Sequence, residues 1–157
     1  MNALFAGLDR LITGLLGLSL LALVGIGGAQ IVLRVALSYP LPWATEFSVV
    51  LMIWATMLAG YVGVRRNSHL SADFLGLSMS AGVRRGLRLF SLALSLAFVL
   101  TYGWQSRLVI DAMEGIPFTS LPLTQPLLYW SLPVGAALMA LALADQLWRE
   151  RRAAPEA

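Results

Sequence analysis

Four long apolar segments, separated by charged or proline-rich connections, constrain this chain more than any other feature. They cover residues 11–33, 43–64, 89–106 and 127–147. A helix of about 20 apolar residues crosses the hydrocarbon core of a bilayer. Of the 157 residues, 59% are hydrophobic and 12% are charged, and a soluble domain of that composition would expose a large apolar surface. We therefore predict an all-α integral membrane protein, with residues 1–157 forming a single membrane domain.

The apolar segments carry signals for how they begin, bend and pack. The first has 23 residues without an ionisable group, longer than the apolar region of a signal peptide, so we expect a retained helix. Pro133 predicts a kink near the start of the fourth segment. Small residues spaced by four predict helix-packing faces; they are Gly25 and Ala29, then Ala55, Ala59 and Gly63, then Ala136, Ala140 and Ala144.

The connection between the second and third segments has a helical periodicity but is too polar to cross a membrane. At about 100° per residue, one face collects apolar side chains and another collects polar ones. The apolar face has Leu70, Phe74, Leu77 and Ala81, and the polar face has His69, Asp73 and Ser80. We predict a short amphipathic helix over residues 69–82, lying in the membrane interface.

The arginines predict the orientation of the four spans. Nine lie in the head, the middle connection and the tail, against Arg34 and Arg107 on the other side. The positive-inside rule then places both termini in the cytoplasm. The aromatic residues agree with this topology, because Tyr39, Trp43, Tyr102, Trp104, Tyr129 and Trp130 would collect at the outer interface, and Tyr61 and Trp148 at the inner one.

Several function classes are excluded or disfavoured by the residues present. The chain has no cysteine and one histidine, which excludes thiolate metal sites, disulfides and haem held by two histidines. The arginines flank the spans and form no basic stripe, which argues against nucleic acid. A hydrolase built on His69 and Asp73 has no specified nucleophile. We expect no catalytic, cofactor-binding or metal-binding residues, and no enzymatic activity.

The ionisable residues near the span ends have a structural and a functional interpretation each. Glu46 lies in the first turns of its helix, where the helix dipole stabilises a carboxylate and Arg34 is a candidate ion-pair partner; the alternative is a partner contact. His69 and Asp73, near Arg65 and Arg66, predict a local polar cluster, with a proton relay as the alternative. Asp145 can pair with Arg149 one turn later. Arginines of the middle connection are topology determinants and lipid-headgroup contacts; they are Arg84, Arg85 and Arg88.

The same residues, taken in order, resemble the small DctQ-type membrane subunit of tripartite ATP-independent periplasmic (TRAP) transporters. The resemblance covers nearly the whole chain. Its motifs are a Trp-x-x-Glu start to the second helix, a tryptophan within that helix, a basic corner with His and Asp, and an aromatic residue, a Pro and a Gly in the fourth helix. In this sequence they are Trp43 and Glu46; Trp54; Arg65, Arg66, His69 and Asp73; and Tyr129, Pro133 and Gly135. Ser71 and Ala72 depart from the bulkier or basic pair typical of the corner.

The resemblance implies a bacterial inner-membrane scaffold through which the substrate does not pass. In that family a large multi-span permease carries the solute with a cation, and a periplasmic solute-binding protein delivers it. The small subunit would pack against the permease, among membrane lipids, and help dock the binding protein during uptake of an organic acid. Asp111, Glu114 and the proline-rich segment 116–126 are candidates for that docking contact.

Two alternatives from other classes remain open at the level of sequence. One is a self-contained four-helix carrier that works as a homodimer, with Glu46 as its coupling carboxylate. The other is a membrane-anchored scaffold or assembly factor unrelated to transport.

Overall fold

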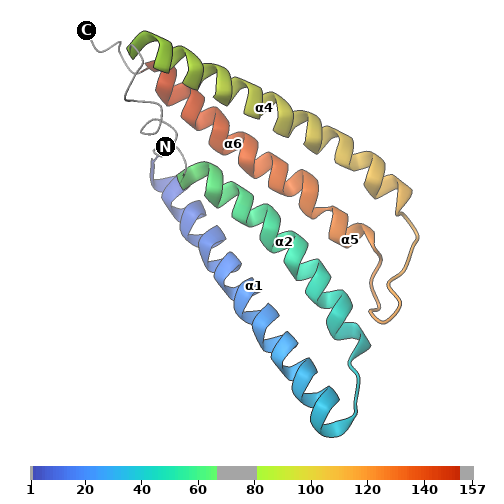
Figure 1. The fold of residues 1–157 in the computed structure, drawn as a ribbon. Helices are drawn as coiled ribbons and strands as arrows, with labels where there is room; N and C mark the ends of the chain where they lie inside the picture. The colour runs from blue at the N-terminus through green and yellow to red at the C-terminus, as the bar shows by residue number, and fades with distance from the viewer. Residues whose placement is uncertain (1, 67–80, 153–157) are drawn as a thin grey trace.

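Long helices account for most of the chain in the computed structural model, which describes residues 2–66 and 81–152 (Figure 1). They are α1 (Asn2–Leu37), α2 (Pro42–Arg66), α4 (Ala81–Ala112) and α6 (Ser131–Arg152), with the short α5 (Pro126–Tyr129) before α6. Within the described ranges, four helices are long and apolar enough to cross a membrane, with α5 and α6 counted together. The prediction of an all-helical chain with four such segments is confirmed.

The helices extend beyond the predicted apolar segments, because the backbone ladder continues through flanking charged residues that favour helix. The third is the clearest case: it begins at Ala81 and runs past Arg107 and Asp111 to Ala112. The predicted interfacial helix over residues 69–82 falls almost entirely outside the described residues.

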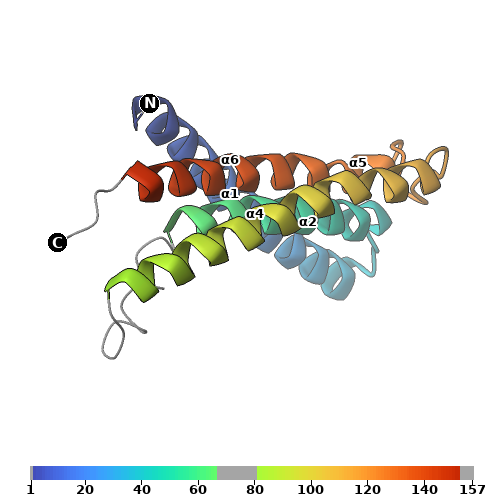
Figure 2. The ribbon, with the colours of Figure 1, turned by 90° about the horizontal axis from the view of Figure 1, so that it is seen from above.

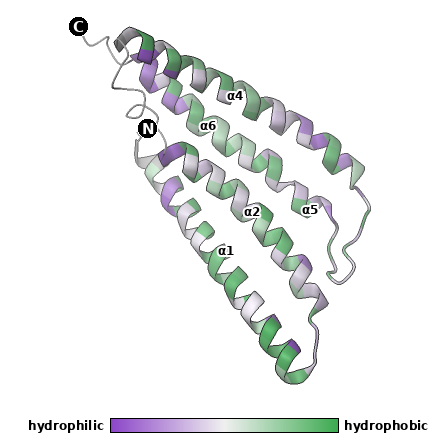
Figure 3. Ribbon diagram, viewed as in Figure 1, coloured by the Kyte–Doolittle hydropathy of each residue, from purple (hydrophilic) through white to green (hydrophobic). Residues whose placement is uncertain are grey.

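The four long helices form a row in the order α4, α6, α2, α1 (Figure 1). Helix α6 packs against both α4 and α2, whereas α1 packs mainly on α2. Seen from above, α1 crosses the other three at an angle (Figure 2). The connectivity alternates, so that α1 and α4 begin, and α2 and α6 end, at one end of the row. We call this the arginine-rich end and the opposite one the loop end. Apolar residues dominate the lengths between them (Figure 3).

Glycines on the helices next to α6 and on α6 itself allow the row to pack closely. A Cβ added at Gly135 would lie 2.7 Å from Cβ of Met57 in α2. A Cβ at Gly103 of α4 would lie 2.9 Å from Cβ of Ala136. Real Cβ atoms do not approach that closely, so a larger residue at either glycine would force the helices apart. Gly135 contacts α2 and the next residue, Ala136, contacts α4, so these two helices pack on two sides of α6.

The fourth span is interrupted near its start, as Pro133 predicts. Helix α5 ends at Tyr129 and α6 begins at Ser131, and the N–H of Trp130 bonds the carbonyl of Pro126 at 2.9 Å. Pro133 has no N–H to offer the carbonyl of Tyr129, so the helical ladder cannot run continuously through this turn.

The predicted small-residue faces divide into two groups. Ala55 and Ala136 are buried, and Ala140 packs against the cluster formed by Val99, Ala136 and Leu143. In contrast, no atom lies within 4 Å of a Cβ built at Gly25 or Gly63, and Ala29, Ala59 and Ala144 are exposed. The second group therefore makes no close packing contact with other helices in the described part of the chain.

Candidate functional site

Helix α2 is attached to distant parts of the chain by one polar anchor at each of its ends. At the loop end Glu46 holds the connection between α4 and α5. At the arginine-rich end Arg65 joins carboxylates from α1 and α6. Glu46 and Arg65 are the predicted site residues whose charged side chains bind other parts of the described chain.

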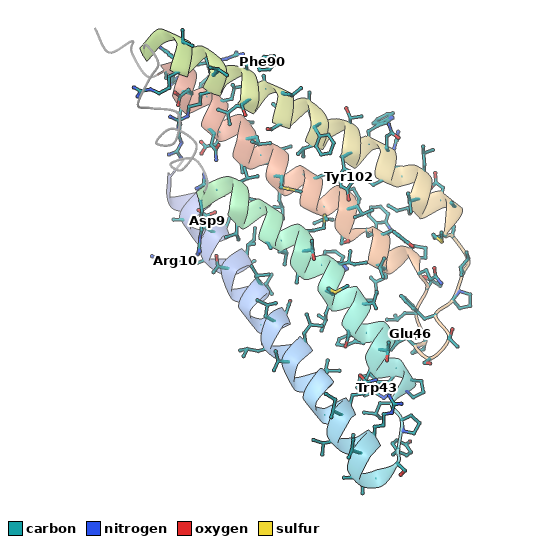
Figure 4. The ribbon with its side chains drawn as sticks, viewed as in Figure 1. Asp9, Arg10, Trp43, Glu46, Phe90 and Tyr102 are labelled. Carbon is teal, nitrogen blue, oxygen red and sulfur yellow. The ribbon has the colours of Figure 1, made fainter. Side chains whose placement is uncertain are left out.

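The carboxylate of Glu46 accepts three backbone hydrogen bonds from one loop. Its Oε1 accepts from the N–H of Thr119 at 2.8 Å, and its Oε2 accepts from Ser120 at 2.9 Å and Leu121 at 3.0 Å. We call this arrangement the loop anchor. Figure 4 shows Glu46 pointing from α2 toward the loop. Successive backbone N–H groups converging on one anion form a concave site of the kind called a nest.

The loop itself is folded so that its amides can converge. Pro117 and Thr124 form an isolated antiparallel bridge. The N–H of Phe118 bonds the carbonyl of Leu123 at 3.0 Å, and the N–H of Gln125 bonds the carbonyl of Ile116 at 2.9 Å. The tip thus closes as a hairpin, and the amides at the tip point to Glu46. The candidate ion pair between Glu46 and Arg34 is not formed in the structure of residues 2–66 and 81–152.

Trp54 links the middle of α2 to the fourth span. Its indole Nε1–H donates to the carbonyl of Leu127 at 3.2 Å. Because the last four carbonyls of a helix have no partner within it, a carbonyl of the four-residue α5 is free to accept such a bond. Together with the contact between Gly135 and Met57, this bond fixes the start of the fourth span against α2.

The second anchor is a cluster of four charged residues and one tyrosine from three helices, which we call the charge cluster. It consists of Asp9, Tyr61, Arg65, Asp145 and Arg149. Arg65 donates from Nη2 to Asp9 at 2.9 Å and from Nη1 to Asp145 at 3.1 Å. Tyr61 is fully buried, and its hydroxyl donates to Asp9 at 2.6 Å. The Arg65 guanidinium therefore bridges α1, α2 and α6.

Asp145 is the most enclosed carboxylate of the charge cluster. Its side chain is 3% exposed, and its Oδ2 also accepts from Arg149 at 2.9 Å, as the spacing of four predicts. Two guanidinium groups thus share this oxygen and offset part of the cost of burying the charge, while Oδ1 has no hydrogen-bond partner among the described residues. Next to it, Gln146 donates from Nε2 to the carbonyl of Val64 at 2.6 Å, so the last turn of α2 is held by α6 twice.

A separate contact closes the arginine-rich end between α4 and α6. Arg88 pairs with Glu150 at 3.4 Å, and Arg85 donates to the carbonyl of Glu150 at 3.1 Å. Two arginines predicted as topology determinants therefore also contact the last turn of α6, where the helix dipole favours cations.

The remaining predicted residues are dispersed. Trp43 and Arg66 are exposed, at the start and end of α2. Tyr129 and Pro133 are half-buried, and Asp111 and Glu114 are exposed at the loop end. His69 and Asp73 lie outside the described residues, so the predicted local cluster around them remains a prediction. Arg65, which was expected to belong to that local cluster, contacts Asp9 of α1 and Asp145 of α6 in the described chain.

Sequence reasoning missed the partners of both anchors. Asp9 is the only carboxylate ahead of the first span, and the topology places it at the same membrane face as Arg65 and Asp145. That shared face was the available signal for the charge cluster. The loop anchor had no such signal, because any residue except proline supplies a backbone N–H. Across the described residues, no group of three or more His, Cys, Asp or Glu side chains could hold a metal ion.

The arrangement supports holding helices together rather than catalysis, since the carboxylates of both anchors are engaged by donors from the chain itself. Among known proteins, the family model of the DctQ component of tripartite ATP-independent periplasmic transporters matches residues 23–153. A search of curated proteins finds no match.

Proposed function

The chain belongs to the DctQ component family of TRAP transporters, and from this premise we propose that it is a fixed scaffold within the transporter complex. The family makes it a multi-pass membrane transport protein and not an enzyme. We propose further that it packs against a large multi-span permease and helps dock a periplasmic binding protein. The permease would then carry out cation-coupled uptake of an organic acid.

The observation that carries the scaffold role is the absence of a polar path through the described helices. The spans 11–33, 43–64, 89–106 and 127–147 contain no Lys, Arg or His, and their only carboxylates are Glu46 and Asp145, each within four residues of a span end. The helices form an open row, with their polar anchors at the two ends. A carrier that moves a charged solute or a proton needs ionisable groups within the membrane. Glu46, the candidate for such a group, has both carboxylate oxygens bonded to loop amides.

The orientation is part of the proposal. With nine arginines at the arginine-rich end or its connections against two elsewhere, that end would face the cytoplasm of a bacterial inner membrane, together with both termini. The loop end, with Asp111 and Glu114, would then face the periplasm and the binding protein.

Co-purification tests the proposal most directly. We expect mild-detergent purification of the tagged chain from its host to recover a much larger membrane protein in fixed ratio, identified by mass spectrometry. Recovery of the chain alone, with solute transport after reconstitution that is lost in Glu46→Gln, would overturn the scaffold role in favour of the self-contained carrier.

The open glycine face of α1 provides a test of where the permease packs. A Cβ at Gly25 meets no other part of the described chain within 4 Å, so Gly25→Leu should leave the isolated chain folded and reduce the co-purified permease several-fold. Gly86→Leu is the matched control, because Gly86 on α4 is equally open. Equal permease recovery from both variants would show that this face of α1 does not contact the permease. Ala59→Leu tests the exposed face of α2 in the same way.

Charge reversal tests the docking surface. If Asp111 and Glu114 contact the binding protein, the double variant Asp111→Lys, Glu114→Lys should lower solute uptake while the complex still assembles. Arg34→Glu, at the same end but on α1, serves as the control. Unchanged uptake in the double variant would exclude these carboxylates from docking.

A further inference from the structure

A groove of about 900 Å³ runs between α4 and the start of the fourth span, in the half of the row next to the loop end. Its walls are large apolar side chains that no part of the described chain covers. Trp104 is 68% exposed, Leu100 57% and Trp130 53%. Leu108 and Ala137 also line the groove. Because these exposed side chains are apolar and belong to helices long enough to cross a membrane, an apolar occupant suits most of the groove.

The floor of the groove is made by the closest approach of the two helices. Gly103 and Ala136 meet there, and since neither carries more than a methyl group, the space above them stays open between the tryptophans. From Arg107 back to Val99 is eight residues, about 12 Å of helix. That length is close to one leaflet of a hydrocarbon core about 30 Å thick.

The end of the groove nearest the loop is polar. The guanidinium of Arg107 lies over the Trp104 ring, 3.5 Å from its centroid, and Arg107 forms no ion pair with any residue in 2–66 or 81–152. Asp111, which also lines the groove, follows one helical turn later, about 6 Å nearer the loop end. Moving outward, the groove therefore presents an apolar trough, a cation and then an anion.

That order matches one class of membrane lipid. In a phosphatidylethanolamine the acyl chains are followed by an anionic phosphate and then by an ammonium group. Tryptophans favour the headgroup level of a bilayer, where Trp104 and Trp130 flank the groove. Phosphatidylglycerol has the phosphate but lacks a cation for Asp111.

We propose that the groove between α4 and α6 binds one phosphatidylethanolamine molecule from the leaflet at the loop end. The phosphate pairs with Arg107, the ammonium group pairs with Asp111, and one acyl chain lies over Gly103 and Ala136. This inference rests on the groove and does not depend on the scaffold role; it gives Asp111 a lipid contact in place of a docking contact, so that Glu114→Lys alone then tests docking.

Lipid retention tests the headgroup contacts. Native mass spectrometry of the purified full chain, exchanged into detergent with equal phosphatidylethanolamine and phosphatidylglycerol, should show one bound phosphatidylethanolamine. Arg107→Gln should reduce the bound fraction of both lipids at least fivefold, whereas Asp111→Asn should remove only the preference for ethanolamine. Arg34→Gln, at the same end on α1, should bind as the unchanged chain does. Equal binding by Arg107→Gln and Arg34→Gln would overturn the proposal.

Photo-crosslinking in native membranes tests the occupant in the assembled complex. A benzophenone side chain in place of Leu108, which lines the groove and is exposed, should give an adduct with the mass of a phosphatidylethanolamine. The same group in place of Leu20, which is exposed on α1 and lies about 140° around the helix from Gly25, should label lipids without that preference. A protein adduct at position 108 would show that a partner subunit fills the groove and would overturn the proposal.

Discussion

The two anchors of α2 use opposite charges and different kinds of partner. At the loop end, a single carboxylate collects backbone N–H groups from three consecutive residues. At the arginine-rich end, a single guanidinium collects side-chain carboxylates from two other helices. The first anchor shapes a loop, and the second joins helices. The Glu46 side chain is in contact with solvent, whereas Asp145 is almost completely enclosed.

This difference has an energetic consequence. Removing a charge from an enclosed cluster leaves its counter-charges buried and unpaired, which is far more costly than removing an accessible hydrogen-bond acceptor whose donors can turn to water. The charge cluster should therefore govern the stability of the whole row, and the loop anchor should govern local order at the loop end. Three substitutions test this contrast.

The largest effect is expected for Arg65→Gln. Loss of the guanidinium leaves Asp9 without a cation and Asp145 with Arg149 alone, and we expect the free energy of unfolding to fall by about 3 kcal/mol. Thermal or denaturant unfolding of the purified chain in detergent measures it. Arg66→Gln is the control, because Arg66 is the exposed neighbour on the same helix. If both variants were equally stable, the charge cluster would not hold α1, α2 and α6 together.

An intermediate and local effect is expected for Glu46→Ala. The amides of Thr119, Ser120 and Leu121 lose their acceptor, so their hydrogen exchange and the proteolysis of this loop should both accelerate. Global unfolding should change less than in Arg65→Gln. Glu114→Ala removes an exposed carboxylate from the same end and should leave exchange unaltered. An unfolding loss in Glu46→Ala as large as that of Arg65→Gln would abolish the distinction between the two anchors.

The smallest effect is expected for Arg149→Gln. Its side chain is 53% exposed and its pair with Asp145 spans one helical turn, an arrangement that contributes about 0.5 kcal/mol or less. We expect a correspondingly small shift in unfolding, and the shift should diminish as salt screens the pair. A loss of several kcal/mol would instead place Arg149 alongside Arg65 as a principal cation of the charge cluster.

Local features of the chain were predictable because their causes act within a few residues. The apolar segments predicted the four spans, Pro133 predicted the interruption now seen at Trp130, and the spacing of Asp145 and Arg149 predicted their pair. Gly135 was a candidate through family resemblance, and its contact with Met57 supplies the physical reason. Glu46 and Arg65 were predicted as contact residues, and the structure gives them partners that the sequence did not indicate: loop amides for Glu46, and Asp9 and Asp145 for Arg65.

The sequence by itself determined the segments that become helices and the residues that end them, since hydrophobic length, proline and backbone hydrogen bonding operate along the chain. Only the tertiary structure decided the order of the row and the partners of its anchors. Arg65 and Asp9 are 56 positions apart, and Glu46 and Thr119 are 73 apart. Such pairs form only where helix packing brings them together, and here that packing depends on the close approach that Gly103 and Gly135 allow on the two sides of α6.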